Sequence, residues 1–366
     1  MVDNEIAQLR NAGVTVVPFL RSSDEIADLS PLEKAKLAVS PIYAAQTQRT
    51  LAALLEAERP DVLHLHNPYP FLSPAVVRTA QRHGVPVVQT VHNYRHVCVS
   101  GLYFRDGAVC HDCRGKAFPT PGVAHGCYRG SRAQSVIMAT SLVANRSTWR
   151  RVDRYIALTG AIERHLRDYG IAADAISVKP NSIPDPGEHD VDGAGFAFAG
   201  RLVEEKGIGL LLAAWARHED GALGTLRIVG DGPLRPEVEE LAGRRGDVEY
   251  VGAVPHDEVT RQFRSVGVVV NPSLCEDVHP TVVIEAMANA RPVVTTELGG
   301  APDMIADAGV VAPPNEAEFS AALHRAAQSA RALRVVARRR YVEYFAPEVV
   351  LQRQLEIYRE VAAARG

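Results

Sequence analysis

The sequence lacks the features that would assign it at once to a membrane or nucleic-acid-binding class. It has no apolar run of about 18 residues, so no stretch predicts a membrane-spanning helix. It also has no large excess of either charge, because 40 lysines and arginines stand against 43 aspartates and glutamates, for a net charge of −3. This balance argues against nucleic acid as the main partner. With no signal peptide before the first expected helix, we expect a soluble, cytoplasmic protein.

Cysteine is scarce, with five residues, and four of them fall close together as Cys98, Cys110, Cys113 and Cys127. Four thiolates are the number that a closed tetrahedral zinc site requires, and the central pair has the C-x2-C spacing of such sites. In a reducing compartment these residues are expected to be thiols or metal ligands rather than disulfides. The segment 98–127 is rich in Gly, Pro and Arg, so we expect it to bury little core and to need a structural zinc.

Two alternatives to that zinc site stay open at this point. Either the four cysteines are thiols without a metal in a flexible loop, or a histidine, His111 or His125, replaces one of the ligands. The outer spacings match no standard zinc finger, so spacing alone does not separate these cases.

The length of the chain and its alternating strand and helix patterns predict an α/β fold with two domains. With 366 residues, of which 46% are hydrophobic, the chain can bury two cores, so two domains of roughly 150 to 180 residues each are expected. We expect an N-terminal lobe at 1–178, a linker at 179–195, a C-terminal lobe at 196–345 and a final helix at 346–366. The linker contains Asp190-Val-Asp192, which we interpret as solvated because no strand precedes it.

The beginning of the chain departs from the usual α/β pattern. Residues 3–12 predict a helix, and the β-branched run Val14–Val17 predicts a strand after it. A parallel α/β domain normally starts with a strand and a glycine-rich turn before its first helix, and neither precedes residue 3. We therefore expect either that the coding sequence starts further upstream or that the site is incomplete, and completeness of the fold favours an upstream start.

Two histidines follow consecutive expected strands of the first lobe. Strands at 61–66 and 85–92 end in His66 and His92, and the carboxyl ends of parallel strands are where ligands bind, so both side chains are expected at one crevice. We interpret His66 as a hydrogen-bonded histidine at a strand end. The basic segment 128–154 carries an apolar stretch at 136–143. Either it rests on anionic lipid or guides a polyprenyl diphosphate, or it is a solvated helix packed on the sheet.

The stretch 268–288 reads as a strand, a loop and a helix that begins at Pro280-Thr281. A helix start presents unpaired N–H groups and the positive end of its dipole, which suits a phosphate or a sugar hydroxyl, so His279, Pro280 and Thr281 are expected at the substrate. Glu285 lies one turn beyond Thr281 on the same face and could accept both hydroxyls of a ribose.

Two cations flank an expected loop at the start of the second lobe. Arg201 and Lys206 follow the strand 196–199, and the glycines beside them let the backbone approach a ligand closely. A departing diphosphate gathers negative charge as its bond to a sugar breaks. Two fixed cations can stabilise that charge without a metal.

These residues resemble the retaining glycosyltransferases of family 4, whose nucleotide-sugar site has two acids separated by seven residues, as Asp277 and Glu285 are. The family usually has Glu at the first position, and here Asp277 is preceded by Glu276, so the resemblance leaves the sugar-contacting acid open between these two. Arg201 and Lys206 match the diphosphate-binding pair of the family. His92 matches a histidine that contacts the transferred sugar, and Val251 falls where the backbone holds the base.

The resemblance implies a GT-B fold, in which two Rossmann-like lobes face each other across a cleft. It implies transfer of a sugar from a UDP- or GDP-sugar to a hydroxyl of a glycan, polyprenyl-linked or small-molecule acceptor, with retention of anomeric configuration and without a catalytic metal. Polysaccharide or lipid-linked glycan assembly, peripheral to the inner face of a membrane, is the expected setting. The alternatives are a non-catalytic sugar-nucleotide-binding or assembly subunit, which the missing first strand and Asp277 favour, and a nucleotide-sugar epimerase.

Overall fold

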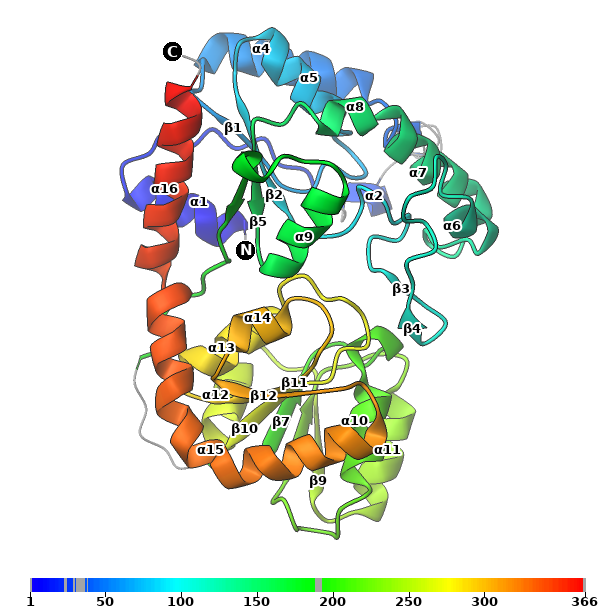
Figure 1. Cartoon of the computed structure of the whole chain (residues 1–366), viewed down its shortest axis with the longest axis vertical. Coiled ribbons are helices and arrows are strands. Elements are labelled where there is room, and N and C mark those ends of the chain that lie inside the picture. The colour runs from blue at the N-terminus through cyan, green and yellow to red at the C-terminus, as the bar shows by residue number, and fades with distance from the viewer. Residues whose placement is uncertain are drawn as a thin grey trace. The chain divides into compact units, whose positions relative to one another are not determined.

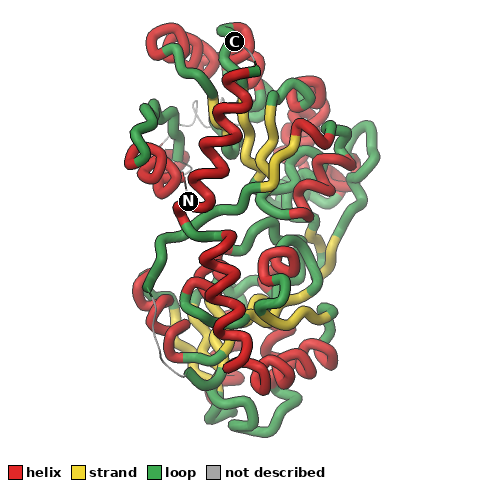
Figure 2. Tube along the Cα trace, turned by 60° about the vertical axis from the view of Figure 1, so that its left-hand side comes forward, coloured by secondary structure: helices red, strands yellow, loops and turns green. Residues whose placement is uncertain are grey.

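The fold is described from a computed structural model of the chain, in which residues 2–22, 25–28, 30, 37, 39–187 and 193–364 are described. The chain divides into two compact units (Figure 1). The first contains residues 2–105, 110–179 and 351–366, and the second contains residues 106–109 and 180–350. Each unit is an α/β structure built on a parallel sheet (Figure 2). The Asp190-Val-Asp192 triplet of the expected linker lies outside the described residues.

In the described part of the first unit, four strands form a sheet in the order β1-β2-β5-β6, and every neighbouring pair is parallel. The elements up to β6 are α1 Val2–Asn11, α2 Glu25–Asp28, α4 Ala45–Glu58, β1 Leu63–Leu65, α5 Ala75–Arg82, β2 Val87–Val91, β3 Phe104–Arg105, β4 Ala108–Val109, α6 Thr120–Ala124, α7 Arg132–Ala144, α8 Arg146–Trp149, β5 Arg154–Ala157, α9 Gly160–Asp168, η1 Ala173–Ala175 and β6 Ile176–Val178. Strands β3 and β4 pair separately, within the cysteine-rich insertion.

In the second unit the described strands from residue 196 onward form a parallel sheet in the order β12-β11-β10-β7-β8-β9. Its elements are β7 Phe196–Ala199, η2 Glu204–Lys206, α10 Ile208–Trp215, β8 Leu226–Val229, α11 Arg235–Arg244, β9 Val248–Gly252, α12 His256–Ser265, β10 Val268–Asn271, α13 Thr281–Ala288, β11 Val293–Thr296, α14 Ala301–Ile305, β12 Gly309–Ala312 and α15 Glu316–Tyr344. Along the chain, β8 and β9 add to one side of β7, and β10, β11 and β12 then add to its other side. The order of the strands therefore reverses at β7, and ligands bind at such a reversal in parallel sheets.

The second unit buries both faces of its sheet, because successive side chains of a strand point to opposite sides. Phe196 and Phe198 of β7 belong to one apolar cluster, whereas Ala197 between them belongs to another. In β10, Val268 and Val270 join the first cluster, and Val269 joins the second. Two cores hold the sheet rigid, so the loops at its carboxyl edge have a firm base.

The last helix, α16 Pro347–Ala363, completes the first unit from the far end of the chain. Its Ile357 and Val361 pack on Val88 of β2 and Ile156 of β5. Gln354 accepts a hydrogen bond from the buried Lys179 ammonium at 3.1 Å. This helix is therefore a structural part of the sheet to which the first 179 residues contribute.

One local prediction for the first unit was wrong. Val14–Val17 is not a strand: the described sheet begins with β1, and the run is only partly buried, because its β-branched pattern found no neighbouring strand to pair with. Pro74 occupies the N-cap position of α5. Ser73 has a positive φ of 57°, and its hydroxyl accepts a hydrogen bond from the Ala44 N–H.

The apolar stretch at 136–143 lies in α7, and most of it faces inward. Met138 and Leu142 are buried, and Val136 is exposed. The side of the helix that a lipid surface would contact is therefore mostly occupied by the unit's own core. Among the described residues, no helix combines the length and the apolarity that crossing a bilayer requires.

Candidate active site

The loop that carries the acids, residues 271–280, leaves β10 and is fixed by two threonines of the neighbouring strand β11. The Asn271 amide donates to Thr295 Oγ1 at 3.0 Å, and Thr296 Oγ1 donates to the Ser273 carbonyl at 2.6 Å. All four side chains are buried. The acidic residues at 276 and 277 therefore follow a backbone that is held by side-chain hydrogen bonds as well as by the strand ladder.

A glycine turn presses directly on these acids. Gly299 has a φ of +68°, and a Cβ built on it would lie 2.4 Å from the Asp277 carbonyl oxygen. The next residue, Gly300, donates its N–H to that same oxygen at 2.8 Å. No side chain fits between the two loops at this point, so the Gly299-Gly300 turn sets the position of the Asp277 backbone.

Both basic residues of the loop after β7 have acidic partners. Lys206 Nζ lies 2.5 Å from Asp277 Oδ2, and the Arg201 guanidinium donates to Glu205 Oε1 at 3.1 Å. The Arg201 side chain is 67% exposed and the Lys206 side chain 29%. Leu274 donates its N–H to the Glu205 carbonyl at 3.0 Å, so the cation loop and the acid loop are joined through the backbone as well.

Glu285 lies on the first turn and a half of α13, where Thr281 hydrogen-bonds to its carboxyl. Burial raises the pKa of Glu285, while the nearby His256 and the Thr281 hydroxyl act in the opposite direction. A half-buried carboxyl of raised pKa, reachable from the loop side of the helix, is suited to accept hydrogen bonds from a ligand when ionised.

The other expected substrate residues of this unit lie around the same loop. His279 is buried and packs against Phe345 with ring centroids 6.2 Å apart, and Pro280 is the N-cap of α13. Glu276 is half-buried beside Asp277. Val251 lies in β9 where the register shifts: Ile228 pairs with Tyr250 but Val229 pairs with Gly252, so Val251 is the extra residue of a bulge. Bulged residues are left out of the ladder, so their backbone groups can serve a ligand.

In the first unit, the two strand-end histidines lie against each other. His66 Nδ1 lies 2.9 Å from His92 Nε2, and their rings stack with centroids 5.2 Å apart. Both line a small pocket at the carboxyl ends of β1 and β2, together with residues 67–69, 89–91, 93, 95, 96 and 149. The pocket therefore lies at the edge of the sheet where the sequence placed the crevice.

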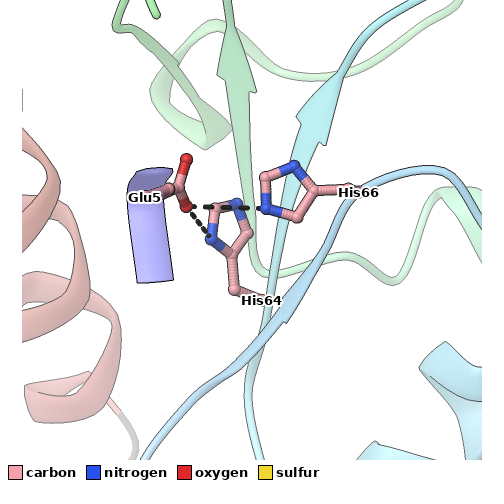
Figure 3. Close-up of side chains that lie close together, drawn as sticks. All are labelled: Glu5, His64 and His66. Atoms are coloured by element: carbon pink, nitrogen blue, oxygen red, sulfur yellow. Dashed lines mark ion pairs between the residues drawn. The ribbon is translucent and has the colours of Figure 1, made fainter. Parts of the chain in front are cut away.

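A carboxylate from α1 extends this histidine pair into a network (Figure 3). Glu5 Oε1 lies 3.0 Å from His64 Nδ1 and 3.5 Å from His66 Nε2, and Lys179 Nζ lies 3.7 Å from Glu5 Oε2. Although burial acts to raise it, the hydrogen bonds from the two histidines hold the pKa of Glu5 well below its usual range. Burial lowers the pKa of His64 to about 4.

Among the described residues, Glu5, His64 and His66 are the only trio whose potential metal-ligand atoms all lie within 4.8 Å of one another. Each ring nitrogen of His64 nevertheless has another neighbour already. The Tyr358 hydroxyl lies 2.6 Å from His64 Nδ1, and Thr90 Oγ1 lies 2.8 Å from His64 Nε2. With an ammonium beside the carboxylate as well, the trio fits a buried hydrogen-bond network better than a metal site.

The wall of the pocket beside His92 carries buried polar atoms that have no hydrogen-bond partner among the described residues. These are Gln89 Oε1, Arg95 Nε, Trp149 Nε1 and both ring nitrogens of His96. Unsatisfied buried groups are costly, so such a cluster points to ordered water or a polar ligand at this place. Burial lowers the pKa of His96 to about 4, so its ring is neutral at pH 7 and can both donate and accept.

The four cysteines of the insertion line a second pocket in the same unit, whereas His111 and His125 are not among its lining residues. The insertion buries more than expected, because Tyr103 is only 2% exposed and stacks on Tyr94 with centroids 4.4 Å apart. The prediction that this segment contributes little to the core was therefore wrong for Tyr103.

Sequence reasoning missed several residues that the structure brings to these sites. Gln89, His96 and Trp149 gave no signal, because polar side chains inside a buried strand or loop follow no periodic pattern. Glu205 was visible in principle, since it lies four positions after Arg201 in the spacing of helical ion pairs.

Comparisons with known proteins agree with this geometry. Residues 2–182 match the family described as glycosyl transferase 4-like domain, and residues 193–329 match glycosyl transferases group 1. An uncharacterized glycosyltransferase of Methanocaldococcus jannaschii is 26% identical over 267 residues, which are 72% of this chain and 64% of that protein. The chain thus spans somewhat less than two thirds of that relative.

Solved structures show the same fold. Sucrose-phosphate synthase of Thermosynechococcus elongatus superposes with a TM-score of 0.65 at 19% identity, over 88% of this chain and 78% of that one. Anabaena HepE in complex with UDP gives 0.61 at 15% identity, over 97% and 89%. Two Rossmann-like lobes with parallel sheets define a GT-B protein. The chain belongs to the group 1 glycosyltransferases of family 4.

Proposed function

We propose that the protein transfers a sugar from a uridine or guanosine diphosphate sugar to an acceptor hydroxyl, with retention of anomeric configuration. The observation that carries this proposal is the junction of the two loops of the second unit at the carboxyl edge of the sheet, where Lys206 lies beside Asp277 and Arg201 lies beside Glu205. Cations beside a carboxylate suit a donor that has both a diphosphate and sugar hydroxyls.

Each group has a role in holding the donor. Arg201 and Lys206 bind the diphosphate oxygens, and Glu285, as a carboxylate, accepts hydrogen bonds from the ribose. The unpaired backbone of the bulge at Val251 holds the base. Asp277, whose backbone is pressed into place by Gly299, accepts from a hydroxyl of the transferred sugar, with Glu276 beside it. HepE, a protein of the same fold, was solved in complex with UDP, so UDP is the first nucleotide to test.

The transfer itself follows a front-face course. The bond between the anomeric carbon and the departing phosphate oxygen breaks as the acceptor oxygen bonds to the same face of that carbon. The acceptor proton passes to the leaving phosphate oxygen, so no protein base is needed. Arg201 and Lys206 offset the charge that develops on the diphosphate, and this stabilisation requires no metal.

The acceptor side is assigned to the pocket beside His92. Its buried Gln89 Oε1, Trp149 Nε1 and His96 nitrogens are suited to the hydroxyls of a sugar or polyol. His92, held by His66 at 2.9 Å, contacts the transferred sugar. Glycan assembly, with a polysaccharide or a lipid-linked oligosaccharide as acceptor, is the setting we propose. A membrane-bound acceptor stays a prediction.

Calorimetric titration of UDP, GDP and ADP into the 366-residue chain tests the donor site. We expect one nucleotide to bind and the Glu285→Gln variant to bind it at least about tenfold more weakly, which corresponds to about 1.4 kcal/mol. Glu240→Gln, which removes an exposed carboxylate paired with Arg244 in the same unit, is the matched control. If no nucleotide binds, or if both variants bind equally, the assignment of the site fails.

A non-catalytic binding subunit would pass that test, so a second measurement separates the two functions. Sugars linked to the nucleotide that calorimetry identifies are incubated with the chain and with candidate acceptors. Release of the nucleoside diphosphate is followed. Release that depends on the acceptor supports transfer, and the anomeric coupling constant of the product reports retention. A sugar product formed from the donor alone would indicate an epimerase instead.

A further inference from the structure

The cysteine-rich insertion contains a pocket that the transfer reaction does not use. Cys98, Cys110, Cys113 and Cys127 all line it, although they come from three different turns of the chain. Cys98 follows the loop after β2, Cys110 and Cys113 follow β4, and Cys127 follows α6. Four thiols from separate segments converge on one place, where Val99 and Phe104 are the apolar side chains that share the lining.

The backbone holds three of these cysteines where they are. The Cys98 N–H donates to the Tyr94 carbonyl at 2.9 Å, the Cys110 N–H to the Tyr103 carbonyl at 2.8 Å, and the Cys127 N–H to the Gly122 carbonyl at 2.9 Å. Tyr94 and Tyr103 are buried and stacked, so the first two anchors are rigid. The convergence is therefore part of the fold.

Gly122 lies at the wall of the pocket and leaves room for the sulfur atoms. A Cβ at this position would lie 2.6 Å from Val99 Cγ2 and 3.3 Å from Cys113 Sγ. Any larger residue would push Cys113 or Val99 away. The absence of a side chain keeps the four sulfurs around a common space.

The rest of the insertion has little to stabilise it. Strands β3 and β4 are two residues long, and residues 114–118 are all exposed. Residues 114–118 bury little apolar surface, so this part of the insertion needs another source of stability, and thiolate-bound metal supplies it in many small domains. A bound divalent cation also offsets the mutual repulsion of several thiolates in one pocket.

We propose that Cys98, Cys110, Cys113 and Cys127 bind one zinc ion in a closed, tetrahedral structural site. Zinc–sulfur bonds of about 2.3 Å would bring the sulfurs to about 3.8 Å from one another. In the structure no three of these sulfurs lie within 4.8 Å of one another, so metal binding requires the thiol side chains to rotate inward.

The site has a consequence for the pocket beside His92. Tyr94 and Arg95 lie between β2 and Cys98, and Arg95 lines that pocket. The ion therefore acts as a positioning element for the loop that follows His92, without contact with the reacting atoms. This inference does not rest on the proposed transfer reaction, and its test needs no substrate.

Metal analysis of the purified full chain is the first measurement. We expect about one zinc per chain in the parent and less than about one per four chains in a Cys110→Ser, Cys113→Ser double variant. Cys275→Ser removes a buried cysteine of the other unit and is the matched control, which should keep its zinc. Cobalt substitution of the parent gives a second readout: sulfur-to-cobalt charge-transfer absorption together with tetrahedral d–d bands. It identifies thiolate ligands even if the double variant fails to fold.

Two results would overturn the proposal. The first is a reduced parent chain that neither contains zinc nor takes up cobalt with thiolate absorption. The second is zinc that the double variant retains but a His64→Ala variant loses, since that metal would belong to the Glu5, His64 and His66 cluster. Disulfide bonds among these cysteines in the parent would count as a form of the first result, because oxidised sulfurs cannot bind zinc as thiolates. Counting thiols before and after reduction would detect them.

Discussion

Lys206 and Asp277 are 71 positions apart in the sequence, and the ammonium of one lies 2.5 Å from a carboxylate oxygen of the other. The pair joins the loop after β7 to the loop after β10. Without a donor, each group is the counter-ion of the other, so neither charge is left uncompensated at the edge of the sheet. If a diphosphate binds Lys206 as proposed, it takes the place of the Asp277 carboxylate as the counter-ion of the ammonium. Asp277 can then accept a hydrogen bond from a sugar hydroxyl.

Arg201 is exposed, so its replacement separates catalysis from stability. We expect Arg201→Ala to lower kcat by roughly 100-fold, because it removes one preorganised charge, and to change the free energy of unfolding by less than about 0.5 kcal/mol. Arg244→Ala is the control, since Arg244 is also 67% exposed and also pairs with a glutamate four residues away. Similar turnover in the two variants would remove Arg201 from the mechanism.

Gly299→Ala should disturb the acids through the backbone. The substitution combines a positive φ with a collision against the Asp277 carbonyl, so we expect it to cost more than the roughly 1–3 kcal/mol of an unfavourable φ alone and to weaken nucleotide binding. Gly221→Ala is the control, because Gly221 also has a positive φ, of 78°, but a Cβ there would have open space around it. Thermal unfolding and calorimetry of both variants make the comparison, and equal effects would contradict the contact-based explanation.

Glu285 predicts how nucleotide binding depends on pH. Burial raises its pKa, and only the ionised carboxyl can accept both ribose hydroxyls, so affinity should fall as pH decreases through that raised value. Titrations between about pH 8 and pH 5 should show the loss beginning above the usual range of a glutamate. Glu285→Gln should bind more weakly and lose this step. A step that persists in the variant would assign the titration to another group.

His96 predicts acid sensitivity of the first unit. Its pKa is lowered by burial from 6.5 to about 4, so above pH 6.5 both folded and unfolded states hold it neutral. Below pH 6.5 the unfolded state binds the proton first, and the free energy of unfolding should drop by up to about 3 kcal/mol on reaching pH 4. Chemical denaturation at several pH values measures this. His96→Asn should remove this share of the dependence and leave the shares of His64 and His165, whose pKa values burial also lowers, whereas His324→Asn, which changes an exposed residue, should leave it unchanged.

Much of the fold could be predicted because the relevant signals are local. The pattern of 3–12 and the β-branched run of β2 identify a helix and a strand from their own residues. Val14–Val17 carries a strand pattern too, but a strand also needs a partner, and no local pattern reveals whether one is present. The sequence therefore indicates which segments favour a strand, while pairing decides which of them become one.

The candidate site divides in the same way. Arg201, Lys206, Asp277 and Glu285 could be selected from spacing, yet the contact of Gly299 with Asp277 joins loops that follow different strands. The unsatisfied polar atoms of Gln89, His96 and Trp149 depend on which side chains face one pocket. Such relationships are set by tertiary packing, which the spacing of residues along the chain does not encode.

The C-terminal helix has a consequence for biosynthesis. Lys179 finds its buried partner in Gln354, and His64 finds the Tyr358 hydroxyl, so these bonds of the first unit wait for residues made 175 and 294 positions later. On the ribosome the second unit has all of residues 180–350 before the part of α16 that belongs to the first unit, from Leu351 onward, emerges. The unit that starts first is therefore completed last. Until α16 packs on it, the apolar face of its sheet is exposed, and a chaperone could bind there.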